Sequence, residues 1–273
     1  KKEIKMMNLI DNYKIINSET DTSIILLHSY GKTEKRKKDG NLKDTKCNKK
    51  EDESSEVFAF NTEEKIKSMM EVFNKHIAES RANTMEKRAR RNKLVFLVGI
   101  NIGIRAGDLI KLKWNFFIES LNSDGTVEKF KEYYDLKPEK QKKQNKFVRL
   151  HFNETVRRAI NEYVENFPIT NLEDYIFFAT DNSNEHISYH ALYEMLKKTA
   201  KEAGIKENIG THSLRKTWGF WCWHKAMDKS KALTILQKCF NHSSVETTLK
   251  YIGLLDSEIK EMYNSIELGM EYI

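Results

Sequence analysis

Apolar residues recur at helical spacing along most of the chain, beginning near Val57. Asn61 followed three residues later by Glu64 is typical of a helix N-terminus. The apolar positions after this start fall three or four residues apart, as one buried face of a helix requires, at Ile66, Met69, Met70, Phe73 and Ile77. The pattern predicts an amphipathic helix that covers a core.

Further helices are predicted downstream. The run Leu94 to Ile104 is almost wholly apolar and indicates a buried helix. Asn153 precedes a second amphipathic stretch and is a favoured N-cap residue. A third stretch extends from Ser188 to Ala203 and should end at Gly204, because glycine commonly terminates helices.

Between the buried run and Asn153 the pattern becomes β-like. Three short segments are rich in aromatic and β-branched residues: 115–118, 130–136 and 147–152. They predict a small antiparallel sheet. The expected fold is therefore mainly α with a minor β component, an α+β domain that spans residues 57–273.

Residues 1–56 differ from the rest of the chain. The stretch Lys32 to Lys50 holds nine Lys or Arg residues against three acidic ones. Such a block is usually solvated, so it is either a flexible linker or a basic arm that contacts DNA backbone. The net charge of +7 over 273 residues favours an anionic partner, but a lysine-rich surface alone gives the same value.

Cysteine usage and hydropathy narrow the class of protein. Cys47, Cys222 and Cys239 are an odd number without a C-x-x-C pair, which argues against a disulfide framework and a structural zinc site. The longest apolar run is well short of the ~20 residues that span a bilayer, and no secretion signal is visible. We expect a cytoplasmic protein with no metal, no cofactor and no membrane partner.

Two short motifs carry candidate chemistry, and each has an ordinary structural explanation. His212 and Arg215 stand three residues apart, so one helical face could direct both at an anion, as could a plain polar surface pair. His242 precedes the run Ser243 to Glu246, which has the spacing of a capping box. A helix N-terminus at that place would also offer N–H groups to a phosphate.

A third motif, G-I-R-A-G-D-L-I-K-L-K-W at 103–114, lies upstream of these two. With F-N-H-S-S-V-E-T-T-L-K-Y-I-G at 240–253, the set resembles the tyrosine recombinase, or phage integrase, family over roughly residues 57–273. That family has an early Arg in a G-x-R-x-x-(E/D)-L context, then H-x-x-R, a later His and a Tyr nine residues beyond it. The chain matches it in identity and order at Arg105, His212, Arg215, His242 and Tyr251.

The family also carries a lysine in a β-hairpin. Alignment of residues 143–153 with the pattern K-T-G-K-x-x-x-x-P-L-N selects Lys143, with Lys142 one residue away as the alternative. The chain departs from the family at Gln144, at His151 and at Asn241, which stands where Gly usually precedes the histidine. These departures concern loop shape and remove no catalytic side chain.

The resemblance implies a mechanism. Arg105 and Arg215 would neutralise the scissile phosphate in place of a metal ion, and Tyr251 would attack it to form a 3′-phosphotyrosyl link. His212 would act as the base, and Lys143 would protonate the leaving 5′ oxygen. These roles are implied by the family and not by spacing.

Further roles are implied for two more residues. His242 would hydrogen-bond the phosphate. Asp108, three residues after Arg105, would orient the site without touching the reacting atoms, although a surface acid at a helix start has the same pattern.

Other polar and aromatic clusters have weaker functional readings. His186 and His190 have the spacing of metal ligands on a helix, but Ser188 between them is typical of an N-cap. The aromatic residues from Trp218 to Trp223 either stack on bases or pack a buried helix. Packing is the simpler interpretation directly after Arg215.

We therefore expect a site-specific DNA recombinase or integrase acting on double-stranded recombination sites. The rivals are a type IB topoisomerase, which resembles the family in chemistry, and a DNA-binding protein without catalysis. The family also implies a helical DNA-binding domain on the N-terminal side, for which residues 1–56 are too short in its usual form. In the tail 256–273, Asp256 or Ser257 can cap a helix whose apolar stripe is Ile259, Met262, Tyr263 and Ile266. The stripe either folds on its own domain or, as in the family, docks on a neighbouring subunit in a tetramer.

Overall fold

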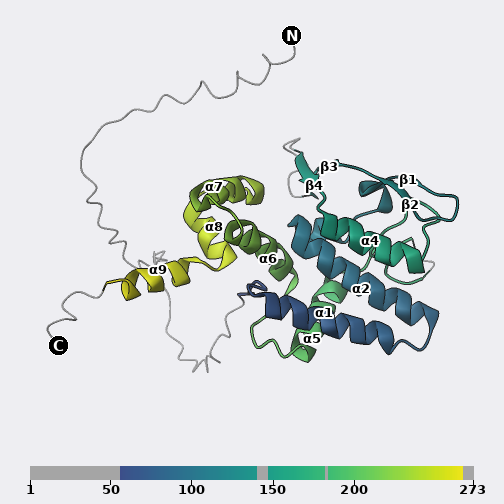
Figure 1. Ribbon diagram of the computed structural model, residues 1–273, viewed down its shortest axis with the longest axis horizontal. Helices are drawn as coiled ribbons and strands as arrows, with labels where there is room; N and C mark the ends of the chain where they lie inside the picture. Colours follow the sequence, from purple (N-terminus) through teal and green to yellow (C-terminus); the bar gives the residue numbers. More distant parts are fainter. Residues whose placement is uncertain (1–55, 140–146, 182–183, 267–273) are drawn as a thin grey trace, which may run out of the picture. The chain divides into compact units, whose positions relative to one another are not determined.

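The computed structural model describes residues 56–139, 147–181 and 184–266, in the second of two compact units of the chain. In chain order (Figure 1) the elements are α1 (Glu63–Ala78), α2 (Asn83–Ile102), α3 (Ala106–Leu109), η1 (Trp114–Phe116), β1 (Ile118–Leu121), β2 (Val127–Phe130), β3 (Tyr133–Leu136), β4 (Val148–His151), α4 (Glu154–Asn166), α5 (Tyr189–Glu202), α6 (Thr211–His224), α7 (Lys229–Phe240), α8 (Val245–Ile252) and α9 (Leu255–Asn264). The expected fold class, mainly helical with a small antiparallel component, is confirmed.

Helix α2 lies at the centre of the main core and packs against α1, α4 and α6. Its predicted apolar run is buried as expected, with Val95, Phe96 and Val98 fully inaccessible. Phe96 contacts Phe60 edge-on at a centroid distance of 5.3 Å and Phe73 of α1 at 5.4 Å. These rings join the segment before α1 to the helices that carry the site.

A second, smaller apolar cluster holds α7 and α8 against α6. It consists of Leu236, Phe240, Ile252 and Leu254. Gly219 of α6 makes this packing possible, because a Cβ there would lie 2.6 Å from the Phe240 ring and 2.8 Å from Ile252. The cluster therefore sets the position of the corner between α7 and α8.

The β-rich region forms two separate two-stranded antiparallel sheets, not one. β1 pairs with β2, and β3 pairs with β4 with Tyr133 opposite His151. Residues 115 and 116 of the predicted segment 115–118 belong to the 3-10 turn η1 and only Ile118 lies in β1, while 130–136 is divided between β2 and β3. Alternating apolar residues indicated extended chain there but not which strands would pair.

Helix starts agree with the sequence at two places. Asn153 accepts a hydrogen bond from the Val156 N–H, and Ser188 accepts one from the Ala191 N–H. α5 ends before Gly204, which has a φ of +74°.

At three other helix starts the predicted cap is wrong. Thr62 caps α1 in place of Asn61, and Ser244 caps α8 in place of Ser243. α9 begins at Leu255, not after Asp256 or Ser257. Neighbouring Ser, Thr and Asn side chains cap equally well, so spacing alone could not choose among them.

Among the described residues, no helix is both long and apolar enough to cross a membrane.

Candidate active site

The turn between α2 and α3 places Arg105. Gly103 ends α2 with a φ of +63°, a conformation that costs most side chains energy. A Cβ on Gly103 would also overlap the Trp218 ring, whose atoms would lie 2.1 to 2.6 Å away. The chain then leaves this tight turn, and Arg105 becomes the N-cap residue of α3 with its side chain half-buried.

Arg215 projects from α6 and ties three segments together. Its guanidinium donates through Nη1 to the carbonyl of Gly103 and through Nη2 to the carbonyl of Cys239 at 3.2 Å. It also lies 4.6 Å from the Phe240 ring centroid. Burial lowers the pKa of Arg215, and the charge of Arg105 lowers it further, so the two predicted arginines lie within electrostatic reach of each other.

His212 lies one turn before Arg215, near the N-terminus of α6. Its side chain is exposed, whereas Arg215 is only 9% exposed. The expected helical face therefore has an outer histidine and a buried arginine, an arrangement that leaves the imidazole accessible to an incoming substrate.

The corner between α7 and α8 carries His242. Asn241 ends α7 in the left-handed region, with φ 58° and ψ 47°. The sequence has Asn where the related family has Gly, and the structure explains this departure because Asn tolerates that region better than other side chains. The Nδ1 atom of His242 lies 3.1 Å from the Thr248 hydroxyl, within hydrogen-bond distance. Burial lowers the pKa of His242, and the positive charges of Arg215 and Arg105 lower it further.

Tyr251 on α8 faces these groups. Its ring contacts His242 at a centroid distance of 5.1 Å and Phe240 at 5.0 Å. Burial raises the pKa of Tyr251, while the charges of Arg215 and Arg105 and a hydrogen bond from Arg215 lower it in part. The tyrosine hydroxyl therefore lies beside Arg215 and within electrostatic reach of Arg105.

Asp108 of α3 is buried, at 9% exposure, so the interpretation as a surface acid is wrong. Its Oδ1 accepts a hydrogen bond from the Glu139 backbone N–H at 3.0 Å. Glu139 is the last described residue before the segment 140–146, and both Lys142 and Lys143 lie outside the described residues. Asp108 thus fixes the backbone of Glu139, which precedes the predicted hairpin lysine in the sequence.

A cavity of about 290 Å³ is lined by Arg105, Asp108 and Arg215, with Cys239 and with Arg149 and His151 of β4. His212, His242 and Tyr251 are not among its lining residues. Arg149 is held by two hydrogen bonds to Asp135 of β3, at 2.8 and 2.9 Å. The cavity is rich in cationic groups, which suits an anionic substrate.

Sequence reasoning missed Lys216, the residue directly after Arg215. It is only 7% exposed, and its Nζ lies 5.5 Å from the centroid of the Tyr251 ring. No signal along the chain marked it, because the burial of the stretch 213–217 follows from tertiary packing.

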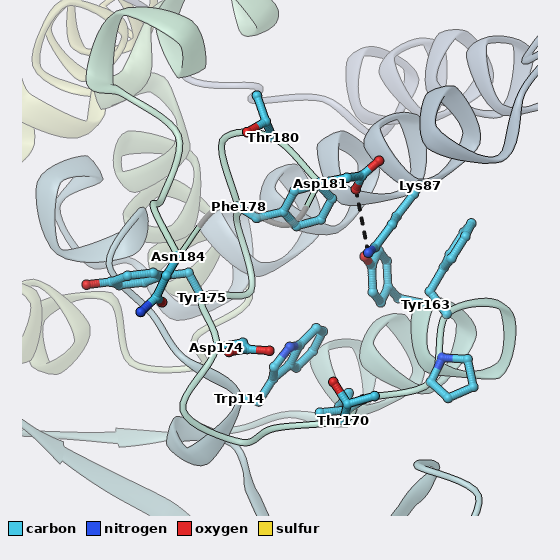
Figure 2. A pocket seen from close by; sticks show the side chains of 13 residues that line it. Lys87, Trp114, Tyr163, Thr170, Asp174, Tyr175, Phe178, Thr180, Asp181 and Asn184 are labelled. Atoms are coloured by element: carbon cyan, nitrogen blue, oxygen red, sulfur yellow. Dashed lines mark ion pairs between the residues drawn. The ribbon is translucent and has the colours of Figure 1, made fainter.

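Another cavity of about 290 Å³ lies apart from these residues (Figure 2). Trp114, Tyr163 and Phe178 are among its lining side chains, and Lys87 forms an ion pair with Asp181 at 3.5 Å across it. None of the predicted catalytic residues that the structure describes lines it.

The remaining sequence candidates have structural roles. His186 precedes the Ser188 cap, so it is not on the same helix as His190, and no group of metal-binding side chains occurs among residues 56–139, 147–181 and 184–266. Trp218 packs on the Gly103 turn and Trp221 donates to the Phe60 carbonyl at 2.8 Å. The aromatic cluster therefore packs α6, as the simpler interpretation had it.

Two recombinase structures resemble the described fold. The crystal structure of XerA recombinase superposes with a TM-score of 0.51 and 21% identity, over 77% of this chain and 64% of that one. The XerH site-specific recombinase bound to palindromic difH substrate, a post-cleavage complex, gives 0.51 and 19%, over 74% and 51%. These likenesses confirm the expected recombinase catalytic fold.

Sequence relatives agree with the fold. The probable integrase/recombinase YoeC of Bacillus subtilis strain 168 is 28% identical over 174 residues, 64% of this chain and 83% of that protein. The tyrosine recombinase XerC of Caldanaerobacter subterraneus subsp. tengcongensis is 24% identical over 185 residues, 66% of this chain but 46% of that protein. The model of the phage integrase family matches residues 60–258, so the chain belongs to the phage integrase family, whose enzymes break and rejoin DNA strands.

Proposed function

We propose that the protein is a site-specific DNA recombinase that cleaves and rejoins strands through a covalent link between Tyr251 and a 3′-phosphate. The observation that carries the proposal is that Tyr251 and Arg215 both pack on the Phe240 ring, at 5.0 and 4.6 Å from its centroid, where the charges of Arg215 and Arg105 lower the Tyr251 pKa. A scissile phosphate placed between them would have a nucleophile on one side and two cations around its non-bridging oxygens.

Residues of this chain can accept and donate the protons that cleavage and rejoining require. The Tyr251 hydroxyl attacks phosphorus and gives its proton to His212, because burial keeps the phenol pKa high and a base is required. The bond to the 5′ oxygen breaks as Lys143 donates a proton to it. The free 5′-hydroxyl of the partner strand then attacks the phosphotyrosine and gives its proton to Lys143. The diester is restored as the bond to the Tyr251 oxygen breaks, and that oxygen takes its proton back from His212.

The charges of Arg105 and Arg215 replace a metal ion in this scheme. Negative charge grows on the non-bridging oxygens at the transition state, and forked guanidiniums stay charged at any working pH. His242 adds a hydrogen bond to the phosphate, and Asp108 acts through the backbone it holds. No cofactor is needed, since the protein–DNA ester conserves the bond energy.

The assembly proposed is a homo-tetramer on double-stranded recombination sites, linked by the tail 256–273. Two apolar side chains of α9 are exposed, Ile259 at 44% and Tyr263 at 76%, and Ile266, just beyond the end of α9, is exposed at 60%. These positions are not covered by the described part of their own domain, which supports docking on a neighbouring subunit. Residues 1–56 would serve as a basic arm along the DNA backbone, in the cytoplasm.

The covalent link tests this function. Wild-type protein and the variants Tyr251→Phe and Tyr263→Phe are incubated in EDTA with duplexes nicked beside candidate sites from the gene's own neighbourhood. We expect an SDS-resistant adduct with the wild type and with Tyr263→Phe, because Tyr263 is an exposed residue of α9. Tyr251→Phe should bind the DNA and form no adduct.

The same assay separates the rivals. An adduct that persists in Tyr251→Phe would place the nucleophile elsewhere, and inhibition by EDTA that added magnesium or zinc reverses would refute the metal-free scheme. A protein without catalysis would give no adduct with any variant. A type IB topoisomerase would relax supercoiled plasmids that lack the target site, which a site-specific recombinase would leave supercoiled.

A further inference from the structure

The segment before α1, residues 56–60, lies along the helix that carries His212 and Arg215; we call it the lead-in segment. Its backbone pairs with the loop before α6, since the Phe58 N–H donates to the Asn208 carbonyl at 3.0 Å. The Asn208 side chain donates in turn to the Glu56 carbonyl at 3.0 Å. The start of the lead-in segment is thus fixed beside the N-terminus of α6.

The end of the lead-in segment is fixed to α6 itself. The Phe60 N–H donates to the Thr217 hydroxyl at 2.8 Å, and Trp221 donates to the Phe60 carbonyl at 2.8 Å. Phe60 and Thr217 are both fully buried. Displacement of this segment would therefore leave buried polar groups unpaired, so the segment and α6 should move together.

Lys216 lies between the lead-in segment and the tyrosine. Its Nζ contacts Glu56 Oε1 at 3.0 Å on one side, and on the other it lies 5.5 Å from the centroid of the Tyr251 ring. Lys216 is 7% exposed, whereas the Glu56 side chain is 50% exposed. A buried ammonium between a carboxylate and an aromatic face has little freedom, which makes it a suitable support for that ring.

Lys216 differs in its effect from the two arginines. Arg215 and Arg105 are the cations that lower the Tyr251 pKa, after burial has raised it. Lys216 lies against the face of the Tyr251 ring. Its contact therefore affects the orientation of the phenol more than the acidity of the hydroxyl.

We propose that Lys216 is a positioning residue for Tyr251, held in place by Glu56, so that the lead-in segment governs the placement of the tyrosine. The inference rests on the proposed role of Tyr251 as nucleophile. Any partner or DNA contact that shifts residues preceding Glu56 would then act on the tyrosine through a single ion pair.

The variants are chosen to separate charge, shape and coupling. Lys216→Met keeps the apolar stem and removes the charge, Lys216→Arg keeps the charge, and Glu56→Gln releases the lysine. Lys225→Met is the matched control, because Lys225 is an exposed lysine of the same region that lies 5.4 Å from the Trp221 ring, away from Tyr251.

The first readout is single-turnover adduct formation on a nicked duplex from pH 6 to 9. A cation–aromatic contact of this kind corresponds to roughly a tenfold rate loss in Lys216→Met, with DNA affinity unchanged. Glu56→Gln should lie between that variant and wild type, and Lys216→Arg should recover most of the rate. The pH at half-maximal rate should stay the same in all of them.

Three outcomes would overturn the proposal. Wild-type rates in Lys216→Met would remove any role for the lysine. Recovery of that variant at high pH would mean that Lys216 acts on acidity and not on position. Wild-type rates in Glu56→Gln would break the link to the lead-in segment, even if Lys216→Met failed to fold.

A second readout does not depend on cleavage. In protein labelled with fluorotyrosine, the ¹⁹F resonance that disappears in Tyr251→Phe is assigned to Tyr251. It should shift in Lys216→Met and Glu56→Gln and stay in place in Lys225→Met. An unmoved resonance in Lys216→Met and Glu56→Gln would refute the inference. An adduct that still forms in Tyr251→Phe would refute the proposed function alone.

Discussion

Arg215 has both a structural role and a role at the active site, and comparison with Arg105 separates the two. Its side chain satisfies the carbonyls of Gly103 and Cys239 inside the protein and also faces the Tyr251 hydroxyl. Arg105 is half-buried at the start of α3. One arginine therefore holds the fold around the site, while the other is available mainly for substrate.

Replacement of each arginine by alanine should show this difference. We expect both Arg105→Ala and Arg215→Ala to lose on the order of 10²-fold or more in cleavage rate, as when one preorganised charge-stabilising group is removed. Arg215→Ala should also lose about 1–3 kcal/mol of unfolding free energy, because two carbonyls lose their donor. Urea unfolding and single-turnover cleavage measure the two effects.

Arg105→Ala serves as the control for stability, with a change expected within about 0.5 kcal/mol. Equal destabilisation by the two variants would show that Arg215 has no special part in holding the fold. A full cleavage rate in either variant would remove that arginine from the mechanism.

The sequence identified some residues of the candidate site and missed others. Arg215, His242 and Tyr251 carry chemistry that only a converging arrangement uses, and their order along the chain already indicated one site. Lys216 was missed because its burial follows from the packing of residues 56–60 on α6, a contact between segments 160 positions apart. No local pattern encodes such a contact.

At the scale of elements, two left-handed residues shape the site. Gly103 turns the chain from α2 into α3, and Asn241 turns it from α7 into α8. Gly103 lies two residues before Arg105 and Asn241 one residue before His242, and the Gly103 carbonyl also accepts a hydrogen bond from Arg215. The backbone conformation at these two helix ends therefore sets where the two predicted catalytic residues lie.

Gly103→Ala should disturb this arrangement strongly. The left-handed conformation costs an alanine about 1–2 kcal/mol, and the added Cβ would overlap the Trp218 ring. We expect a loss of at least about 2 kcal/mol in unfolding free energy, measured by urea denaturation.

Gly107→Ala is the matched control, four residues further along. A Cβ at Gly107 would meet nothing within 4 Å, and the residue lies within α3, where alanine is favoured over glycine by up to about 1 kcal/mol. It should leave stability unchanged or slightly raise it. A Gly103→Ala protein as stable as Gly107→Ala would show that the turn adapts and that its geometry is not required.

The sequence predicted the type of each element more reliably than it predicted helix ends or strand pairing. Helical spacing predicted α2, α4 and α5, because their apolar faces are continuous. The caps at Thr62 and Ser244 were displaced by one residue, since adjacent polar side chains compete for the same N–H groups. The division into two sheets depends on which strands meet, which alternation of side chains does not specify.

At the scale of the whole molecule, the exposed apolar side chains of α9 support the proposed assembly of copies of the chain. A helix that belonged only to its own domain would bury its apolar stripe, yet Ile259 and Tyr263 of α9 are exposed, as is Ile266 just beyond the end of the helix. Exposed apolar residues occur elsewhere too, including Met227 at the loop before α7. Among the exposed large apolar residues that the structure describes, only Ile259 and Tyr263 stand one turn apart on the same helix, the spacing that a groove on a neighbouring subunit would receive.

The double variant Ile259→Ser/Tyr263→Ser tests whether this stripe acts between subunits. Both side chains are exposed, so the monomer should unfold at the same urea concentration as wild type and bind a single half-site with the same affinity. Higher-order complexes on paired sites should be lost and strand exchange should fall with them, as measured by native gels and recombination assays. Met227→Ser removes a fully exposed apolar group outside the stripe and should change none of these. If the double variant unfolded earlier, α9 would belong to its own core; if it assembled and recombined normally, docking through this stripe would be wrong.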